Sequence, residues 1–106
     1  MSQQLWIKMA NLVFELEKKL PAPVSTGVQR NMDRMKAVLE EAGLLILNPI
    51  GEVYAETRTD LEASITGTGR EELHIVDVIK PVIYERGVAG RSIVQKGVVI
   101  AGNKRG

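Results

Sequence analysis

The chain has 106 residues, of which 44% are hydrophobic and 25% charged, and its formal net charge is +1. This balance is typical of a globular domain, and the near-neutral charge argues against a nucleic-acid-binding protein, which usually carries a clear basic excess. The absence of cysteine excludes a disulfide framework and thiolate chemistry. No apolar run approaches the roughly 20 residues of a membrane span, and the N-terminus lacks the pattern of a secretory signal. We therefore expect a cytoplasmic protein without a membrane partner.

Apolar residues in the first 20 positions recur at helical spacing and predict an amphipathic helix. Trp6 and Val13 widen the apolar stripe, whereas Phe14 lies off it, so we expect this helix to have more than one packing surface. Pro21 and Pro23 should end the helix, because proline lacks the backbone N–H and disfavours helix in the preceding residue. The residues of the stripe are Leu5, Met9, Leu12, Leu16 and Leu20.

A second helix is predicted to begin near Ser25 or Thr26, whose side chains can cap its free N–H groups. Gly43 is predicted to stop it, because glycine readily adopts the left-handed conformation found after helices. A short loop with two prolines therefore joins two helices into a hairpin. The apolar stripe of the second helix comprises Val28, Met32, Met35, Leu39 and Ala42.

Short β-rich segments replace the helical periodicity after Gly43. Pro81 cannot donate to a strand ladder and marks an edge, a bulge or a bend, and Gly97 suggests a bulge or the close approach of another backbone. Residues 85–90 are expected to form a turn, and residues 67–72 a hairpin turn rather than a phosphate-binding loop. The predicted strands are residues 44–48, 51–57, 61–66, 74–80, 82–84 and 91–101. This order predicts an α+β fold, with a helical hairpin at residues 1–43 and a small all-β domain at residues 44–106.

No combination of residues indicates an active site, a metal site or a bound cofactor. His74, the single histidine, opens a predicted strand without an evident carboxylate partner, which favours a structural or surface role over acid–base catalysis. The carboxylates Asp60, Glu62, Asp77 and Glu85 are scattered, and solvent-facing charges are favoured over a catalytic pair. The sequence thus favours a protein that works by contact and is not an enzyme.

Three short motifs occur in an order that resembles the GrpE family, the nucleotide exchange factors of DnaK-type chaperones. Residues 32–54 run from a helix through a glycine into a segment similar to the family's Ile-x-Pro-x-Gly pattern. Residues 61–63 are similar to the family's His-Glu-Ala, and residues 90–101 to its closing motif. The similarity extends from about Leu5 to Ala101 and does not include the long N-terminal stalk helix of typical members. The matching positions are Gly43, Pro49, Gly51, Glu52, Tyr54, Gly90, Arg91, Ile93, Val98 and Ile100.

The resemblance implies a co-chaperone that dimerises through a four-helix bundle and docks its β-domain on the ATPase domain of a DnaK-type chaperone, or of another actin-fold ATPase. Docking would favour the open nucleotide cleft and promote ADP release, without any bond being made or broken. The helical stripes also favour a homodimer, because they exceed what one hairpin can bury; the alternative is that both stripes pack on the chain's own sheet. The residues expected at the dimer interface are Leu12, Leu16, Met35 and Leu39.

The contact with the chaperone is expected near the closing motif, where polar residues interrupt an apolar strand. Ordinary solvated charge is an equally favoured interpretation for Arg91 and Lys96. Val94 stands where the family has an arginine, so the alternative function is a dimeric scaffold or adaptor that keeps the GrpE-like fold and binds another partner without exchange activity. The expected partner-binding residues are Tyr84, Glu85, Arg86, Arg91, Gln95 and Lys96.

Overall fold

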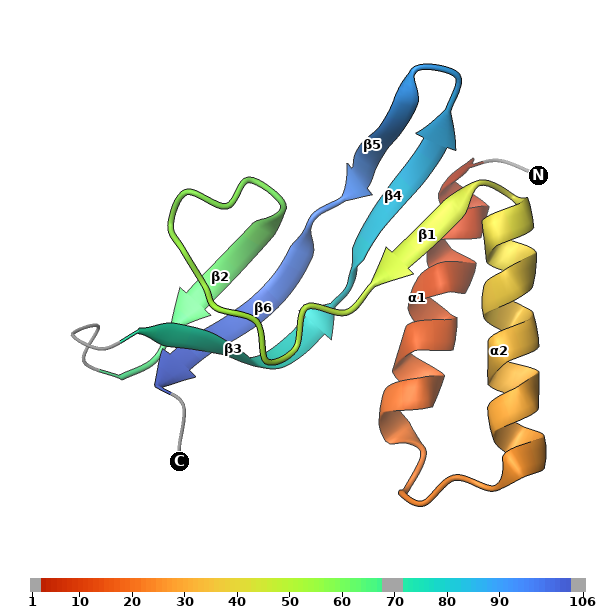
Figure 1. Ribbon diagram of the computed structural model, residues 1–106, viewed down its shortest axis with the longest axis horizontal. Helices are drawn as coiled ribbons and strands as arrows, with labels where there is room; N and C mark the ends of the chain where they lie inside the picture. The colour runs from red at the N-terminus through yellow and green to blue at the C-terminus, as the bar shows by residue number, and fades with distance from the viewer. Residues whose placement is uncertain (1–2, 68–71, 104–106) are drawn as a thin grey trace. The chain divides into compact units, whose positions relative to one another are not determined.

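The computed structural model describes residues 3–67 and 72–103. Within these residues, two N-terminal helices pack as a hairpin and are followed by two small three-stranded sheets (Figure 1). The predicted α+β class, with the helices preceding the strands, is confirmed. The chain divides into two compact units, one formed by Met1–Ile46 with Tyr84–Ser92 and the other by Leu47–Ile83 with Ile93–Gly106.

Helix α1 spans Gln3–Lys19 and helix α2 spans Thr26–Glu41. The predicted cap is confirmed, because the side chain of Ser25 accepts a hydrogen bond of 3.3 Å from the backbone N–H of Val28. Lys36 of α2 forms an ion pair of 2.6 Å with Glu17 of α1, which links the two helices on their flank.

The two helices use their predicted apolar stripes differently. In α2 the middle of the stripe lies inward, since Met32 and Leu39 are buried, whereas Val28 and Ala42 at its ends are exposed. In α1 the buried residues are Ala10, Val13 and Phe14, so Phe14, which lies off the predicted stripe, belongs to the core. Helix α1 therefore has one buried face and a separate exposed apolar stripe, and the predicted second packing surface stays a prediction. The stripe residues left about half exposed are Leu5, Met9, Leu12 and Leu16.

The first sheet has the order β1-β4-β5, with β1 at Leu44–Leu47, β4 at Val82–Gly87 and β5 at Gly90–Gln95. Only residues 88 and 89 separate β4 from β5. The expectation that residues 85–90 form a turn is therefore wrong for all but residues 88 and 89, because residues 85–87 lie in β4 and Gly90 begins β5. Strand pairing with β1 and β5 extends β4 to Gly87 and leaves the reversal of the chain to the residues after it.

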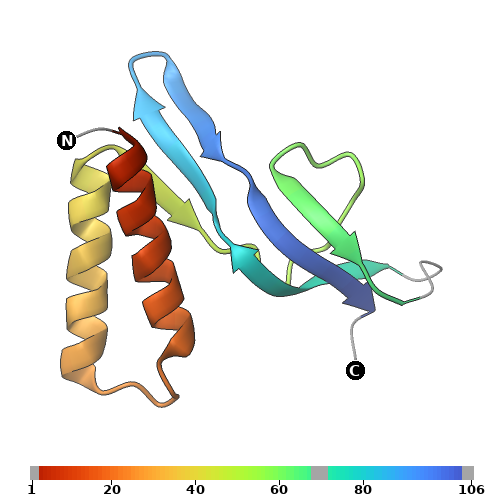
Figure 2. The ribbon, with the colours of Figure 1, turned by 180° about the vertical axis from the view of Figure 1, so that it is seen from behind.

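The second sheet has the order β2-β6-β3, with β2 at Leu61–Ile65, β3 at Leu73–Lys80 and β6 at Gly97–Asn103. Strand β6 pairs in parallel with β2 and antiparallel with β3, and Figure 2 shows it between them. The predicted hairpin at residues 67–72 is wrong, because the strands on either side of this segment are not neighbours. Residues 68–71 of that segment lie outside the described part of the chain.

Residues 51–57 do not form the predicted strand, although part of this segment pairs with β3. The backbone of Gly51 and Glu52 exchanges hydrogen bonds of 2.8 Å with Ile75, and Tyr54 N–H donates to Leu73 O at 2.8 Å. The pairing is limited to one bridge, between Val53 and His74. The segment therefore covers the edge of β3 without becoming a regular strand.

The predicted closing strand at residues 91–101 is instead two strands, β5 and β6, which belong to different sheets. The break falls at Lys96, and the next residue, Gly97, is buried. A Cβ atom at Gly97 would lie 2.9 Å from Leu61 Cδ2 and 2.9 Å from Val82 Cγ2. The expected close approach of another backbone is therefore wrong in its partner, because the closest atoms belong to side chains and the backbone atom Lys80 O lies at 3.5 Å. Pro81 likewise lies at a bend, between β3 and β4.

Candidate protein-interaction site

Three of the predicted contact residues lie in β4, and the alternation of side chains along this strand divides them between its two faces. Successive side chains of a strand point to opposite faces, so Tyr84 and Arg86 share one face while Glu85 points to the other. Consistent with this alternation, Tyr84 and Arg86 line a pocket, whereas the Glu85 carboxylate accepts a hydrogen bond from the side-chain amide of Gln3 in α1. Glu85 is therefore part of the packing between α1 and β4.

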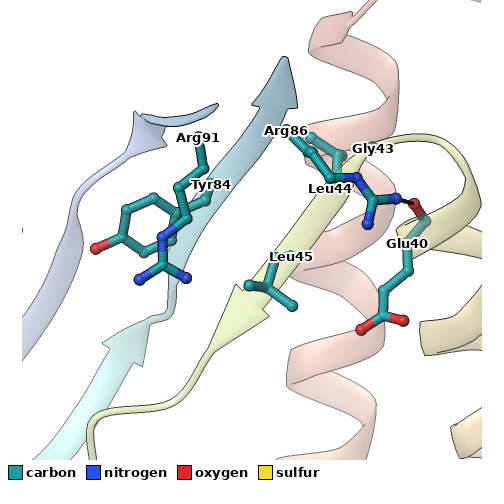
Figure 3. A pocket seen from close by; sticks show the side chains of 7 residues that line it. All are labelled: Glu40, Gly43, Leu44, Leu45, Tyr84, Arg86 and Arg91. Atoms are coloured by element: carbon teal, nitrogen blue, oxygen red, sulfur yellow. Dashed lines mark hydrogen bonds between the residues drawn. The ribbon is translucent and has the colours of Figure 1, made fainter. Parts of the chain in front are cut away.

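The pocket is a hollow of about 130 Å³ between the C-terminal end of α2, β1 and the β4–β5 hairpin (Figure 3). Leucine side chains and the Tyr84 ring supply apolar wall, while two guanidinium groups supply positive charge. All of its lining residues belong to the first compact unit. They are Glu40, Gly43, Leu44, Leu45, Tyr84, Arg86 and Arg91.

Arg91, at the start of β5, stacks its guanidinium on the ring of Tyr84, with 4.4 Å between Cζ and the ring centroid. Figure 3 shows the two side chains lying against each other at the edge of the pocket. Such a cation–π contact contributes about 0.5–1 kcal/mol at an exposed site. A guanidinium has N–H donors that can bind a carboxylate in two parallel bonds. The contact with the ring restricts the positions of the Arg91 side chain.

Arg86 has a different role, because its donors are directed to the end of α2. Its Nη2 donates to the carbonyl of Glu40 at 2.9 Å, and its backbone N–H donates to the carbonyl of Gly43 at 2.8 Å. The last carbonyls of a helix lack partners within the helix, and a cation there also complements the helix dipole. Arg86 therefore links α2 to β4, and its role at the pocket is structural.

The remaining predicted contact residues, Gln95 and Lys96, belong to the second compact unit. The side-chain amide of Gln95 donates to the carbonyl of Pro81 at 2.9 Å and is partly buried, which indicates a structural role. Lys96 is exposed between β5 and β6. The structure thus groups Tyr84, Arg86 and Arg91 at one site and does not add Gln95 or Lys96 to it.

Sequence reasoning missed the part of the pocket that comes from α2 and β1. Gly43 was recognised as a helix stop, but nothing in the sequence connects Glu40 with Arg86, which lies 46 positions later. An apolar pair after a helix stop, here Leu44 and Leu45, is also an ordinary signal for a core strand. Leu44 is indeed buried, whereas Leu45 is half-buried at the pocket.

The four residues predicted at the dimer interface lie in two different environments. Leu12 is 57% exposed and Leu16 is 45% exposed, so both are accessible on α1. Met35 is half-buried, and Leu39, only 2% exposed, is packed within its own chain. Of the four predicted residues, the two on α1 are therefore more accessible than the two on α2.

An ion-pair cluster lies in the second unit, where the sequence suggested only scattered surface charges. Arg58 binds Asp60 through two bonds, Nε to Oδ1 at 3.1 Å and Nη2 to Oδ2 at 2.9 Å, and its Nη1 lies 3.0 Å from Glu52 Oε1. Hydrogen bonding from Arg58 lowers the pKa of Asp60, an effect that burial partly opposes. The cluster closes the loop between β1 and β2, and the expectation that Asp60 faces solvent freely is wrong.

His74 has a carboxylate neighbour that its sequence context did not reveal. Its Nε2 lies 3.3 Å from Glu72 Oε1, and its side chain is largely buried. Nδ1 is also buried and makes no hydrogen bond to the described residues. This burial fits a structural role for His74.

Across residues 3–67 and 72–103, no three His, Asp or Glu side chains are grouped so that they could hold a metal ion. The described helices are also too short or too polar to cross a membrane. No protein-family model, curated protein or solved structure matches this chain.

Proposed function

We propose that this protein is a cytoplasmic, homodimeric co-chaperone of the GrpE type, which promotes ADP release from a DnaK-type ATPase by contact. The observation that carries the proposal is the conformation of the motif glycines. Gly43, Gly51 and Gly90 have φ angles of 89°, 83° and 114°, a region that other residues rarely adopt. The backbone conformation at these three positions thus requires glycine. This supports the view that the turns of this chain correspond to turns of the GrpE family, and that the match is not one of composition alone.

The architecture supports the same proposal. The resemblance implies bundle helices followed by a β-domain, and the chain has a helical hairpin followed by small sheets. An exchange factor needs a contact surface rather than a catalytic cluster, because it acts by binding the open ATPase more tightly than the closed one. A tenfold preference for the open state shifts the equilibrium by about 1.4 kcal/mol, and the shift cannot exceed this differential affinity.

The contact surface proposed for the ATPase is the site formed by Arg91, Tyr84 and the apolar wall of the pocket. Arg91 is exposed and oriented by the Tyr84 ring, and Leu45 offers apolar area beside it. A partner segment with a carboxylate next to an apolar side chain would match both features. Glu85, Gln95 and Lys96, which were also predicted to contact the partner, are not needed for this surface.

The test is the release of a fluorescent ADP analogue from the DnaK-type ATPase of the same cell, measured by stopped flow with and without the protein. We expect release to be accelerated, and to be accelerated less by the Arg91→Ala variant. A Lys96→Ala variant is the matched control, since it removes an exposed positive charge outside the pocket. Unchanged release at saturating protein would contradict exchange activity.

A dimeric scaffold without exchange activity is the second candidate, and it is favoured by Val94. This residue is half-buried in β5, so an apolar side chain occupies the position where the family has an arginine. A scaffold would bind another partner without altering nucleotide release. Binding measured by calorimetry together with unchanged release kinetics would therefore support the scaffold and exclude the exchange factor.

A further inference from the structure

An uncovered apolar seam runs along α1. Within the seam the spacings are four, three and four residues, which is the repeat that packs one helix against another in coiled coils. Each seam residue is about half exposed, although the opposite side of the same helix is buried in its own chain. The seam consists of Leu5, Met9, Leu12 and Leu16, with exposed fractions of 50%, 49%, 57% and 45%.

Two exposed charges of opposite sign flank the seam. Lys8 immediately precedes Met9 and Glu15 immediately precedes Leu16, so the two charges are seven residues apart on the same side of the helix. In a heptad repeat both occupy the position next to the core that makes ion pairs between helices. The other flank carries the half-buried Trp6 and the buried Val13, which face the chain's own core.

We infer that a second copy of the chain covers this seam, with the two α1 helices antiparallel about a two-fold axis near Ala10 and Asn11. In this arrangement Leu5 packs against the partner's Leu16, and Met9 packs against the partner's Leu12. Lys8 then lies beside the partner's Glu15, and the symmetry repeats this ion pair. The inference depends on the proposed homodimer and adds to it the contacting helix and its direction.

Charge complementarity selects the antiparallel direction and the second copy as occupant. In a parallel pair, the position of Lys8 faces the one occupied by the partner's Val13, and no ion pair forms. The seam is also self-complementary, because a half-turn about its centre brings apolar residues onto apolar residues and a positive charge onto a negative one. The stripe of α2 is less accessible, since Met32 and Leu39 are buried within the chain, although Val28 of the same stripe is 38% exposed.

Cysteine cross-linking tests the direction directly, because the chain contains no cysteine of its own. Leu5→Cys and Leu16→Cys variants, mixed and mildly oxidised, should form a disulfide-linked dimer at low micromolar concentration. Leu5→Cys alone should not cross-link, since its two copies would be separated by about 11 residues, or roughly 16 Å along the helices. Efficient cross-linking of Leu5→Cys alone, without cross-linking in the mixture, would overturn the antiparallel arrangement.

Charge reversal gives an independent test by analytical ultracentrifugation. Lys8→Glu and Glu15→Lys should each weaken self-association by roughly tenfold at low salt, because each places like charges together twice. The double variant should regain association, and a mixture of the two single variants should form a heterodimer. Equal association of all four samples would contradict the ion pairs, and a monomeric unmodified protein would overturn the inference entirely.

These outcomes are distinguishable from failure of the proposed exchange activity. The seam lies on α1, whereas the proposed contact with the ATPase lies on Tyr84 and Arg91 of the β4–β5 hairpin. Cross-linking and sedimentation require no chaperone, so they report on the dimer even if ADP release is unaffected. Both charges are exposed, and circular dichroism of the variants serves as the control for folding.

Discussion

The guanidinium of Arg86 donates from Nη2 to the main-chain carbonyl of Glu40 at 2.9 Å, and so joins β4 to the last turn of α2. The two residues are 46 positions apart in the sequence. The Glu40 carbonyl also accepts a hydrogen bond from the backbone N–H of Gly43 at 2.9 Å, so Arg86 adds a second donor to it and places a positive charge at the negative end of the helix dipole. The bond from Arg86 therefore connects the helical hairpin with the strand that carries Tyr84.

Replacing Arg86 with alanine should lower the free energy of unfolding by about 1 kcal/mol, since a hydrogen bond from a charged group to a helix end is lost. Urea unfolding followed by circular dichroism measures this change. An Arg86→Lys variant should lose less, because it keeps the charge near the helix end. Equal stability of all three proteins would show that the bond contributes nothing to folding.

Gly97→Ala should destabilise the protein by about 1–3 kcal/mol, because the new methyl group would overpack the space against Leu61 and Val82. Gly27→Ala is the matched control, since a Cβ there meets no atom within 4 Å and the residue lies in α2. Alanine at that position should stabilise the protein by up to about 1 kcal/mol. Thermal unfolding of both variants checks the contrast, and a neutral Gly97→Ala would mean that the neighbouring side chains move aside freely.

The Arg58–Asp60 pair predicts a loss of stability in acid. In the folded protein the pKa of Asp60 is lowered from its ordinary value of 3.8, so the ionised form favours folding. This contribution is complete well above pH 3.8, declines as the pH falls through that value, and is lost below the lowered pKa. An Asp60→Asn variant should therefore be less stable than the unmodified protein at pH 6, and the difference should narrow below about pH 4.

Urea unfolding of both proteins at several pH values between 2 and 7 measures this difference. An Arg58→Gln variant removes the donor that lowers the pKa of Asp60. Like Asp60→Asn, it should be less stable than the unmodified protein at pH 6, and the difference should narrow in acid. The side chains of Arg58 and Asp60 are 24% and 22% exposed, so salt should reduce the effect only partly. A constant difference across the whole pH range would contradict the linkage.

Arg91→Ala should weaken binding to the ATPase partner by roughly 1–2 kcal/mol, because the charge-assisted bonds to an acidic group are lost. Stability should change by about 0.5–1 kcal/mol at most, since Arg91 is exposed and its described contact is the Tyr84 ring. Titration calorimetry with the partner measures the affinity, and a melting curve serves as the control. Unchanged affinity would show Arg91 to be ordinary surface charge. A large loss of stability would show that Arg91 has a structural role, and the partner contact would then have to lie on another face.

Much of the local structure could be predicted from the sequence because it depends on neighbouring residues. The prolines after α1, the Ser25 cap and the glycine after α2 set the ends of the helices through short-range sterics and hydrogen bonds. The strand at Leu61–Ile65 was predicted to within one residue, and the interruption at Pro81 was predicted as an edge, a bulge or a bend. Helical spacing also showed that α1 has more than one apolar surface, and the order of elements was sufficient for the α+β class.

Only the tertiary structure decided which of these surfaces is used, because pairing and packing depend on residues far apart in the chain. Spacing could not tell that Phe14 is buried while Leu12 stays exposed, since that choice depends on how α2 packs against α1. It could not show that the closing segment divides at Lys96 between two sheets, because strand pairing is non-local. The pocket has the same origin: Arg86 reaches Glu40 only after β4 is placed beside the end of α2.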